Sequence, residues 1–143
     1  MWKKIAIAAV VSTLIPIALA QGADKSTCDR ACLEKYIDRY MDAMLENNPS
    51  LELFSRDCKF TENGVRLPLG NEGLWVNMSG KGNYKFYIPD IETQQIAFIG
   101  TAREGAANKQ GEGTLVDVAI RLKISKERIS RMKTLYPPQM IQG

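Results

Sequence analysis

A carboxylate and a phenol lie in two neighbouring segments whose patterns could bring them together. Tyr40 belongs to the amphipathic stretch 33–45, and Glu62 ends the run 59–62, which has the residue preferences of a strand. A carboxylate at an apolar pocket has a raised pKa, which suits a general acid or base near neutral pH. A phenol can donate its hydroxyl to a developing enolate oxygen. The pair predicts proton transfer next to a carbonyl group or at a leaving group, with Glu62 and Tyr40 as catalytic residues.

Each of these residues also has a structural interpretation. Glu62 precedes Asn63-Gly64, a turn signal, and could be a solvated acid before that turn. Tyr40 could fill the helix–sheet interface as a core side chain, and Tyr36 is a second phenol one turn earlier. Both interpretations stay open from the sequence.

Large apolar side chains elsewhere in the chain could line a cavity for a small apolar molecule. The predicted lining residues are Tyr36, Trp75, Met78, Phe86, Phe98, Val118 and Ile120. Such residues more often form a plain hydrophobic core, so the pocket is a hypothesis.

The elements that must position these residues follow from periodicity. Apolar residues at helical spacing predict a one-sided helix of about five turns, with Ser26 or Thr27 as its N-cap and Asp29 in its first turn. Residues 51–56 are long enough for further helical turns, and residues 72–78 for a short helix. Alternating residues and turn signals predict strands at 59–62, 84–88, 95–103, 114–124 and 128–135. Helices followed by a strand meander predict an α+β fold.

The first 20 residues have the pattern of a signal peptide. Lys3 and Lys4 precede an uncharged run of 16 residues that ends in Ala18-Leu19-Ala20, a small-x-small cleavage pattern. The run is shorter than the roughly 20 residues of a membrane-spanning helix. We predict cleavage after Ala20, a secreted or periplasmic location, and no stable membrane anchor afterwards. Residues 21–27 then form a polar lead-in, residues 28–136 one domain, and residues 137–143 a tail.

Charge and cysteine content narrow the function classes. Removal of a leader with two Lys and no acid lowers the net charge from +3 to +1, which predicts no nucleic-acid partner. Export would allow a disulfide among Cys28, Cys32 and Cys58. A Cys28–Cys32 pair is awkward on a regular helix, and a Cys32–Cys58 pair would join helix to strand, so the pairing stays open. With no His and three scattered Cys, we expect no metal site and no cofactor.

The order of elements resembles the nuclear transport factor 2-like superfamily, which includes ketosteroid isomerases and SnoaL-like polyketide cyclases. The resemblance spans about residues 28–136 and is closest in the segments 39–44 and 54–57, which read Arg-Tyr-Met-Asp-Ala-Met and Phe-Ser-Arg-Asp. It implies a cone-shaped α+β barrel, with a long N-terminal helix and short helices packed on a strongly curved antiparallel sheet. It also implies that Glu62 takes the position of the isomerase's catalytic Asp, and Tyr40 that of its oxyanion phenol. A secreted, largely uncharacterised branch is similar in three segments together, which are Cys28…Cys32-Leu33, Thr61-Glu62-Asn63-Gly64 and Gly73-Leu74-Trp75.

The sequence also departs from the isomerase pattern. The position of the isomerase's second, protonated acid falls near the apolar Ile120, and the neighbouring acid Asp117 has the opposite strand parity. The His used by scytalone dehydratase, another member of the superfamily, has no counterpart because the chain has no His. A complete isomerase site is therefore not recognisable.

Two hypotheses for function remain. In the first, the protein is a cofactor-independent isomerase, cyclase or dehydratase that uses Glu62 as its carboxylate base on a small apolar molecule in the cone. In the second, it is a non-catalytic secreted module that binds a ligand or a protein partner. The sheet face that carries Ala97, Ile99 and Ala119 beside Arg121 and Lys123 would then be an interface, and the resemblance implies a homodimer there.

Overall fold

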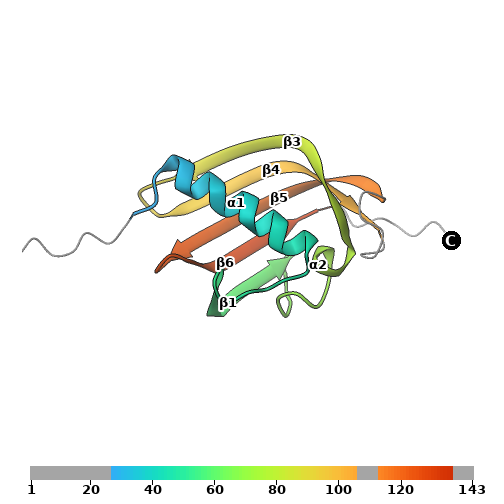
Figure 1. Ribbon diagram of the computed structural model, residues 1–143, viewed down its shortest axis with the longest axis horizontal. Coiled ribbons are helices and arrows are strands. Elements are labelled where there is room, and N and C mark those ends of the chain that lie inside the picture. Colours follow the sequence, from blue (N-terminus) through green and yellow to red (C-terminus); the bar gives the residue numbers. More distant parts are fainter. Residues whose placement is uncertain (1–26, 106–112, 137–143) are drawn as a thin grey trace, which may run out of the picture.

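The computed structural model describes residues 27–105 and 113–136, and it places a long helix against a curved six-stranded sheet (Figure 1). The predicted α+β class is confirmed. The predicted signal peptide (residues 1–20), most of the lead-in (residues 21–26) and the tail (residues 137–143) lie outside the described residues.

Helix α1 (Arg30–Leu45) lies across the inner face of the sheet (Figure 1). Its apolar stripe forms as predicted, and the buried side chains are Leu33, Tyr36, Ile37, Tyr40, Met41, Ala43 and Met44. The N-cap prediction was wrong. Asp29, not Ser26 or Thr27, caps the helix, because its carboxylate accepts a hydrogen bond of 2.8 Å from the backbone N–H of Cys32.

The strands form one sheet in the order β2-β1-β6-β5-β4-β3. Their bounds are β1 (Phe54–Glu62), β2 (Val65–Arg66), β3 (Met78–Asp90), β4 (Gln95–Glu104), β5 (Thr114–Ser125) and β6 (Arg128–Leu135). The short helix α2 (Leu74–Asn77) precedes β3, inside the predicted range. Neighbouring strands are antiparallel except that β1 runs parallel to β6.

Residues 51–56 do not form the expected helical turns. A single turn closes where Ser50 O accepts from Phe54 N at 3.0 Å, and β1 begins at Phe54. The segment pairs with strand β6 instead, because Ile129 N donates a hydrogen bond to Leu53 O at 2.9 Å. Pairing with the sheet and burial of Phe54 therefore outweigh local helix propensity.

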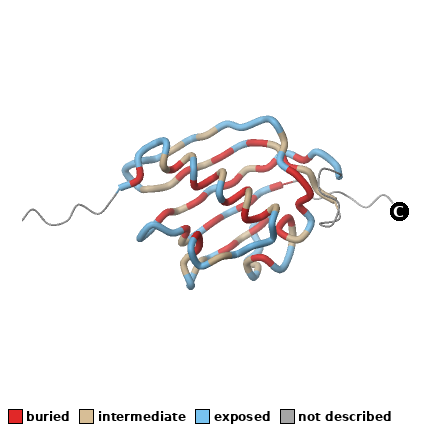
Figure 2. The backbone as a smooth tube through the Cα atoms, in the orientation of Figure 1, coloured by how far each residue is buried: buried red, intermediate tan, exposed pale blue. Residues whose placement is uncertain are grey.

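Buried and exposed residues alternate along the central strands, as Figure 2 shows. In β5, Val116, Val118, Ile120, Leu122 and Ile124 face α1 and form the core with it, as their parity predicts. The intervening side chains lie on the outer face of the sheet.

The sheet has two ends, each with its own set of connections. The turns that join β3 to β4 and β5 to β6 form the turn end, on the left in Figure 1. Helix α2 and the last residues of β1, β4 and β6 form the α2 end, on the right.

Candidate functional site

Glu62 is the last residue of β1, at the α2 end, and it is only 5% exposed. Its backbone pairs with Thr134 of β6, so the carboxylate points to the inner face. Both carboxylate oxygens accept from the backbone N–H of Leu74, at 3.3 Å and 3.2 Å. Strand β1 and helix α2 thus fix one buried acid between them.

The close approach of α2 to Glu62 requires glycine at position 73. A Cβ atom there would lie 1.7 Å from Glu62 Oε1, and the residue has φ +65°. No side chain fits between this backbone and the carboxylate unless Glu62 moves.

We expect Gly73→Ala to lower the free energy of unfolding by about 2–4 kcal/mol, measured by urea denaturation. The Cβ would push Glu62 off the Leu74 N–H and leave both groups buried without their partner. Gly64→Ala is the matched control, because Gly64 also has positive φ (+83°) but a Cβ there meets no atom within 4 Å. Equal losses in the two variants would show that the contact with Glu62 is unimportant.

The pKa of Glu62 is raised above its ordinary value of 4.5. Burial is the largest cause, because it penalises the charged form. The hydrogen bond from Leu74 N–H acts in the opposite direction, and the nearby Glu104 adds a further upward contribution. A carboxyl group in this environment can exchange a proton closer to neutral pH than an exposed one.

Tyr40 is fully buried on the side of α1 that faces β6. Its hydroxyl lies 3.2 Å from Thr134 Oγ1, within hydrogen-bond distance. Its ring packs edge-on against Trp75 and Phe54, with centroids 5.7 Å and 6.2 Å apart. Burial raises the pKa of Tyr40, so this phenol stays protonated and can act as a hydrogen-bond donor.

Thr134 connects the two predicted catalytic residues. It is the strand partner of Glu62 and contacts the Tyr40 hydroxyl with its side chain. The charge of Glu62 also contributes to the raised pKa of Tyr40. The structure therefore brings Glu62 and Tyr40 into one buried polar group of side chains.

Three members of this group escaped the sequence analysis: Glu104, Thr134 and Tyr136. Burial raises the pKa of Tyr136 to about 12, and the charges of Glu62 and Glu104 add to this effect. Strand parity could have found all three, because Glu104 shares the face of Phe98 and Ala102, and Thr134 and Tyr136 share that of Met132. We call this buried group the acid–phenol cluster; its members are Tyr40, Glu62, Trp75, Glu104, Thr134 and Tyr136.

Two buried polar atoms of the cluster lack a hydrogen-bond partner among the described residues. They are the indole Nε1 of Trp75 and Oε2 of Glu104. The Trp75 N–H lies near enough to the Tyr40 hydroxyl to lower its pKa, but it does not reach hydrogen-bonding geometry. The Glu104 carboxylate lies near enough to the Tyr136 hydroxyl to raise its pKa, although Oε2 itself makes no hydrogen bond. Buried polar groups without partners are uncommon in proteins, so the Trp75 N–H is the clearest group that a ligand could satisfy.

The predicted pocket residues divide into three groups. Trp75, Met78, Phe98, Val118 and Ile120 are at most 2% exposed and lie in the core around the cluster. Tyr36 is buried near the turn end, where its hydroxyl donates to Glu127 O at 2.8 Å. Phe86 is 51% exposed and pairs with Ile99 on the outer face, so its assignment to the interior was wrong. Its neighbour Tyr87 faces inward and packs on Phe98 at 5.3 Å instead.

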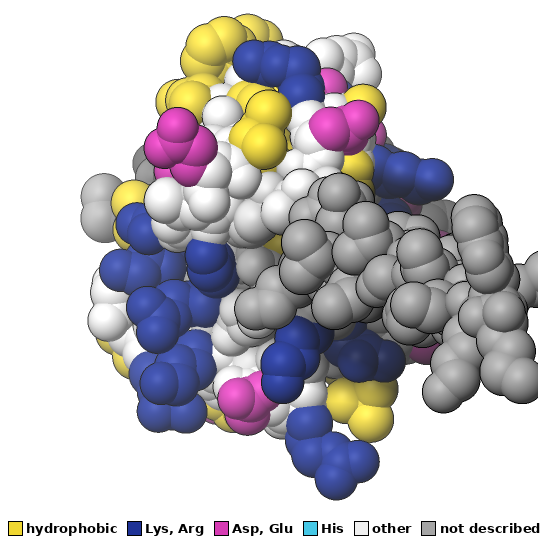
Figure 3. Space-filling view, turned by 90° about the vertical axis from the view of Figure 1, so that its left-hand side faces the viewer, with side chains coloured by type: hydrophobic (Ala, Val, Ile, Leu, Met, Phe, Trp, Pro, Cys, Tyr) yellow, Lys and Arg dark blue, Asp and Glu magenta, His cyan; other side chains and the backbone are white. Residues whose placement is uncertain are grey.

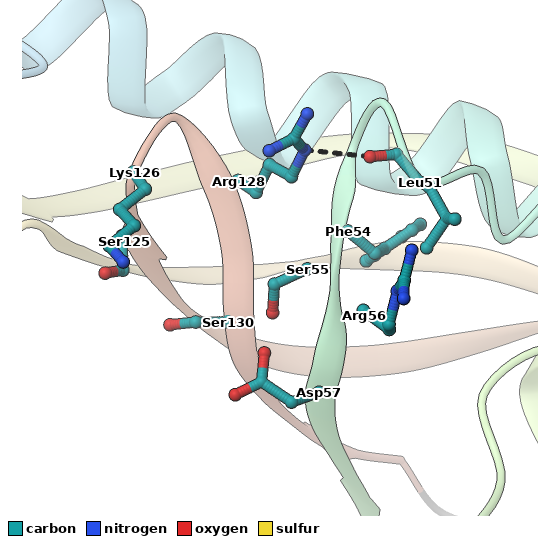
Figure 4. Close-up of a pocket in the computed structure, with 9 residues that line it drawn as sticks. All are labelled: Leu51, Phe54, Ser55, Arg56, Asp57, Ser125, Lys126, Arg128 and Ser130. Carbon is teal, nitrogen blue, oxygen red and sulfur yellow. Dashed lines mark hydrogen bonds between the residues drawn. The ribbon is translucent and has the colours of Figure 1, made fainter.

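Two hollows lie away from the cluster, towards the turn end. One, of about 950 Å³, is bordered by the Cys28–Cys32 pair, Tyr36, Gln94 and Lys126. The other, of about 410 Å³, opens where β1 separates from β6, and Figure 4 shows its residues. Between the pairs Phe54–Ile129 and Lys59–Arg131, four residues of β1 stand against one of β6. Neither hollow is lined by Glu62 or Tyr40.

Cys28 and Cys32 form a disulfide, and Cys58 is free and half-buried. Cys28 precedes the first helical residue, which relieves the geometric difficulty of a pair four residues apart. Burial raises the pKa of the Cys58 thiol to about 11. In residues 27–105 and 113–136, no three or more His, Cys, Asp or Glu side chains are grouped to hold a metal ion. No helix in these ranges is long and apolar enough to cross a membrane.

Comparison with known proteins identifies the fold. No family model matches the sequence, and no curated protein matches it. A protein of unknown function with a cystatin-like fold from Methylobium petroleophilum has 18% identity over 82% of this chain and 83% of its own, with a TM-score of 0.55. A proposed SnoaL-like polyketide cyclase from Shewanella putrefaciens has 16% identity over 90% of this chain and 92% of its own, with a TM-score of 0.56.

A third similar structure is AusH from Aspergillus nidulans. It has 9% identity over 78% of this chain and 88% of its own, with a TM-score of 0.58. Identities this low show the fold and leave the activity open. The chain therefore has the nuclear transport factor 2-like, SnoaL-like fold.

Proposed function

We propose that this protein is an exported small-molecule pocket protein in which Glu62 acts as a cofactor-independent general base or acid. The observation that carries the proposal is the placement of a buried carboxyl group beside a buried phenol and two polar atoms that lack partners. A ligand with a carbonyl oxygen would satisfy the Trp75 N–H. The raised pKa of Glu62 fits proton exchange with a carbon acid.

The reaction class follows from these groups. Glu62 would take a proton from the carbon next to the carbonyl, and the electron pair of the broken C–H bond would move to the carbonyl oxygen. Tyr40 or the Trp75 N–H would donate a hydrogen bond to that oxygen. If the proton returns at another carbon, the reaction is an isomerisation. If the carbanion attacks another carbon of the same molecule, the reaction is a cyclisation, and if it expels a leaving group, the reaction is an elimination such as dehydration.

Export is part of the proposal. It is supported by the leader pattern of residues 1–20 and by the Cys28–Cys32 disulfide, since disulfides persist in oxidising compartments.

A non-catalytic binding module is the second candidate. The close packing of the Tyr40, Phe54 and Trp75 rings favours it, because this contact fills the interior beside Tyr40. In that case the domain would hold an apolar molecule without changing it. The homodimer implied by the family resemblance stays a prediction, and sedimentation of the purified domain tests it.

The two candidates are separated by one experiment on residues 21–143, in which Trp75 is the single tryptophan. A panel of small cyclic ketones is added to the protein in H2O, where NMR follows the indole N–H signal of Trp75, and separately in D2O, where NMR follows the α-hydrogens of each ketone. The enzyme proposal expects the indole signal to shift and deuterium to enter the α position faster than in buffer. A shift without exchange supports the binding module, and no shift with any ketone contradicts the enzyme proposal.

A further inference from the structure

Five cationic side chains gather on the outer face of the sheet, and the acid–phenol cluster does not use them. They are Lys59 of β1, Arg121 and Lys123 of β5, and Arg131 and Lys133 of β6. Four are exposed and Lys123 is half-buried. We call them the basic patch. Figure 3, a view from the turn end, shows Lys and Arg side chains gathered along one side of the molecule.

The strand register places these cations directly opposite one another. Lys59 and Lys123 both pair with Arg131, in one cross-strand row. Arg121 pairs with Lys133 in the next row on the same face. Side chains directly opposite across a sheet are close neighbours, and like charges in such pairs are destabilising. The like-charge cross-strand pairs of the basic patch therefore do not stabilise the fold.

Little acidic charge balances this arrangement. Among the described residues, none of the ion pairs includes a member of the basic patch. On the outer face of β4, β5 and β6, all of which are described, Asp117 is the single acid. Asp57 and Asp90 lie at the borders of the patch. Hydrogen bonds from Thr93 lower the pKa of Asp90, and the charge of Lys123 makes a smaller contribution in the same direction. Arg121 and Lys123 make hydrogen bonds to neutral groups, the Gln95 side chain and the Thr93 carbonyl.

An apolar row borders the patch on the same face. Phe86, Ile99, Ala119 and Leu135 are consecutive partners across β3, β4, β5 and β6. Phe86, Ile99 and Leu135 are 51%, 45% and 56% exposed. The outer face therefore offers phosphate-binding cations next to aliphatic and aromatic side chains, the combination that suits the headgroup and upper acyl region of a membrane.

We propose that the outer face docks on a membrane surface rich in anionic phospholipid, with the basic patch at the headgroups and the apolar row against the lipid. A second copy of the chain fits less well, because it would bring five further cations to a face whose acids are Asp117 and, at the borders of the patch, Asp57 and Asp90. Nucleic acid also fits less well, because the side chains beside the patch are mainly aliphatic and offer few rings for base stacking. The proposal is independent of any activity at Glu62.

The test uses residues 21–143 and sedimentation with vesicles of phosphatidylcholine, either alone or with about one third phosphatidylglycerol. We expect binding to the anionic vesicles, at least tenfold weaker binding to neutral ones, and release at about 1 M NaCl, where screening is strong. Arg121→Glu/Lys133→Glu should weaken binding to anionic vesicles by at least tenfold.

The matched control is Lys35→Glu/Arg39→Glu, which changes the net charge equally at exposed positions of α1, on the opposite side of the sheet. It should change binding less than about threefold. The neutral double variant Arg121→Gln/Lys133→Gln tests whether weaker binding results from the lost charges or from misfolding. It removes a like-charge pair, so its thermal midpoint should equal or exceed that of the parent while its vesicle binding falls.

Three results would overturn the proposal. Equal loss in the patch variant and the control variant would show attraction by net charge alone. Binding to single-stranded or double-stranded oligonucleotides, but not to anionic vesicles, would assign the patch to nucleic acid. Sedimentation as a stable dimer that Ile99→Asp dissociates, without vesicle binding, would assign the face to a second copy.

Discussion

Glu62→Gln is expected to slow α-deuterium exchange of a bound ketone by about 10²–10⁴-fold, the usual contribution of a positioned general base. Glutamine keeps the size of the side chain, and its amide oxygen can still accept from Leu74 N–H, where Glu62 now accepts at 3.2–3.3 Å. It cannot take a proton from carbon. NMR measures the exchange, and the indole signal of Trp75 reports whether the ketone still binds.

Glu62→Gln is expected to raise the stability of the fold at neutral pH, although it slows the exchange reaction. Because the pKa of Glu62 is raised in the folded state, its contribution to stability is fully present below 4.5 and is lost as the pH rises through the folded pKa. At pH 7 the folded protein must hold a buried charge, and glutamine removes that cost. We therefore expect Glu62→Gln to be more stable than the parent by about 1 kcal/mol at pH 7, with the gain vanishing below pH 4.5.

Urea denaturation at several pH values checks this expectation. A variant that is inactive and less stable at pH 7 would indicate that Glu62 mainly caps α2. Unchanged exchange in a stable variant would remove the catalytic proposal and leave the binding module.

Trp75→Ala should lower the free energy of unfolding by about 3–5 kcal/mol, the largest single effect on stability that we expect. The indole is 1% exposed and packs against both Tyr40 and Phe54, at 5.7 Å between centroids in each case. Its removal leaves a cavity between α1, α2 and β1. Denaturation in urea measures the loss directly.

Phe86→Ala is the control, because the sequence places Phe86 and Trp75 in the same predicted pocket. Phe86 is 51% exposed on the outer face, so its truncation should change stability by about 0.5 kcal/mol or less. Similar losses in the two variants would contradict the strand register described here.

The sequence predicts this fold well where periodicity is strong. The amphipathic stretch of α1 and the alternation of Val116 to Ile124 in β5 both place the same side chains in the core as the structure does. Asn63 and Gly64 form the expected turn, each with positive φ. These signals are local, so a single sequence contains them.

Errors arise where long-range contacts decide the outcome. The segment 51–56 does not form the expected helical turns because Ile129 of β6 donates a backbone hydrogen bond to Leu53. No local sequence pattern reveals this long-range contact. Phe86 and Tyr87 are both aromatic and adjacent in a strand, so the inward-facing one depends on the register with β4. The parity of one strand does not fix which of its faces meets the helix.

Local sequence patterns predict half of the acid–phenol cluster and do not reveal the other half. Glu62, Tyr40 and Trp75 were found from segments with recognisable neighbours. Glu104 and Tyr136 sit at the last positions of β4 and just after β6, where a strand pattern fades and an inward direction is hard to assign. Extending the parity of each strand by one step places the Glu104 carboxyl group and the Tyr136 phenol on the inner face.

Proton transfer by Glu62 depends on burial, which raises its pKa, outweighing the hydrogen bond from Leu74 N–H, which lowers it. The most direct measurement is the ¹³C titration of the Glu62 side-chain carboxyl, assigned by its absence in Glu62→Gln. We expect a midpoint above 4.5, which moves further when a ketone binds and shifts the Trp75 indole signal. A midpoint at or below 4.5, unchanged by every ligand, would mean that Glu62 is a helix-capping anion and takes no part in proton transfer.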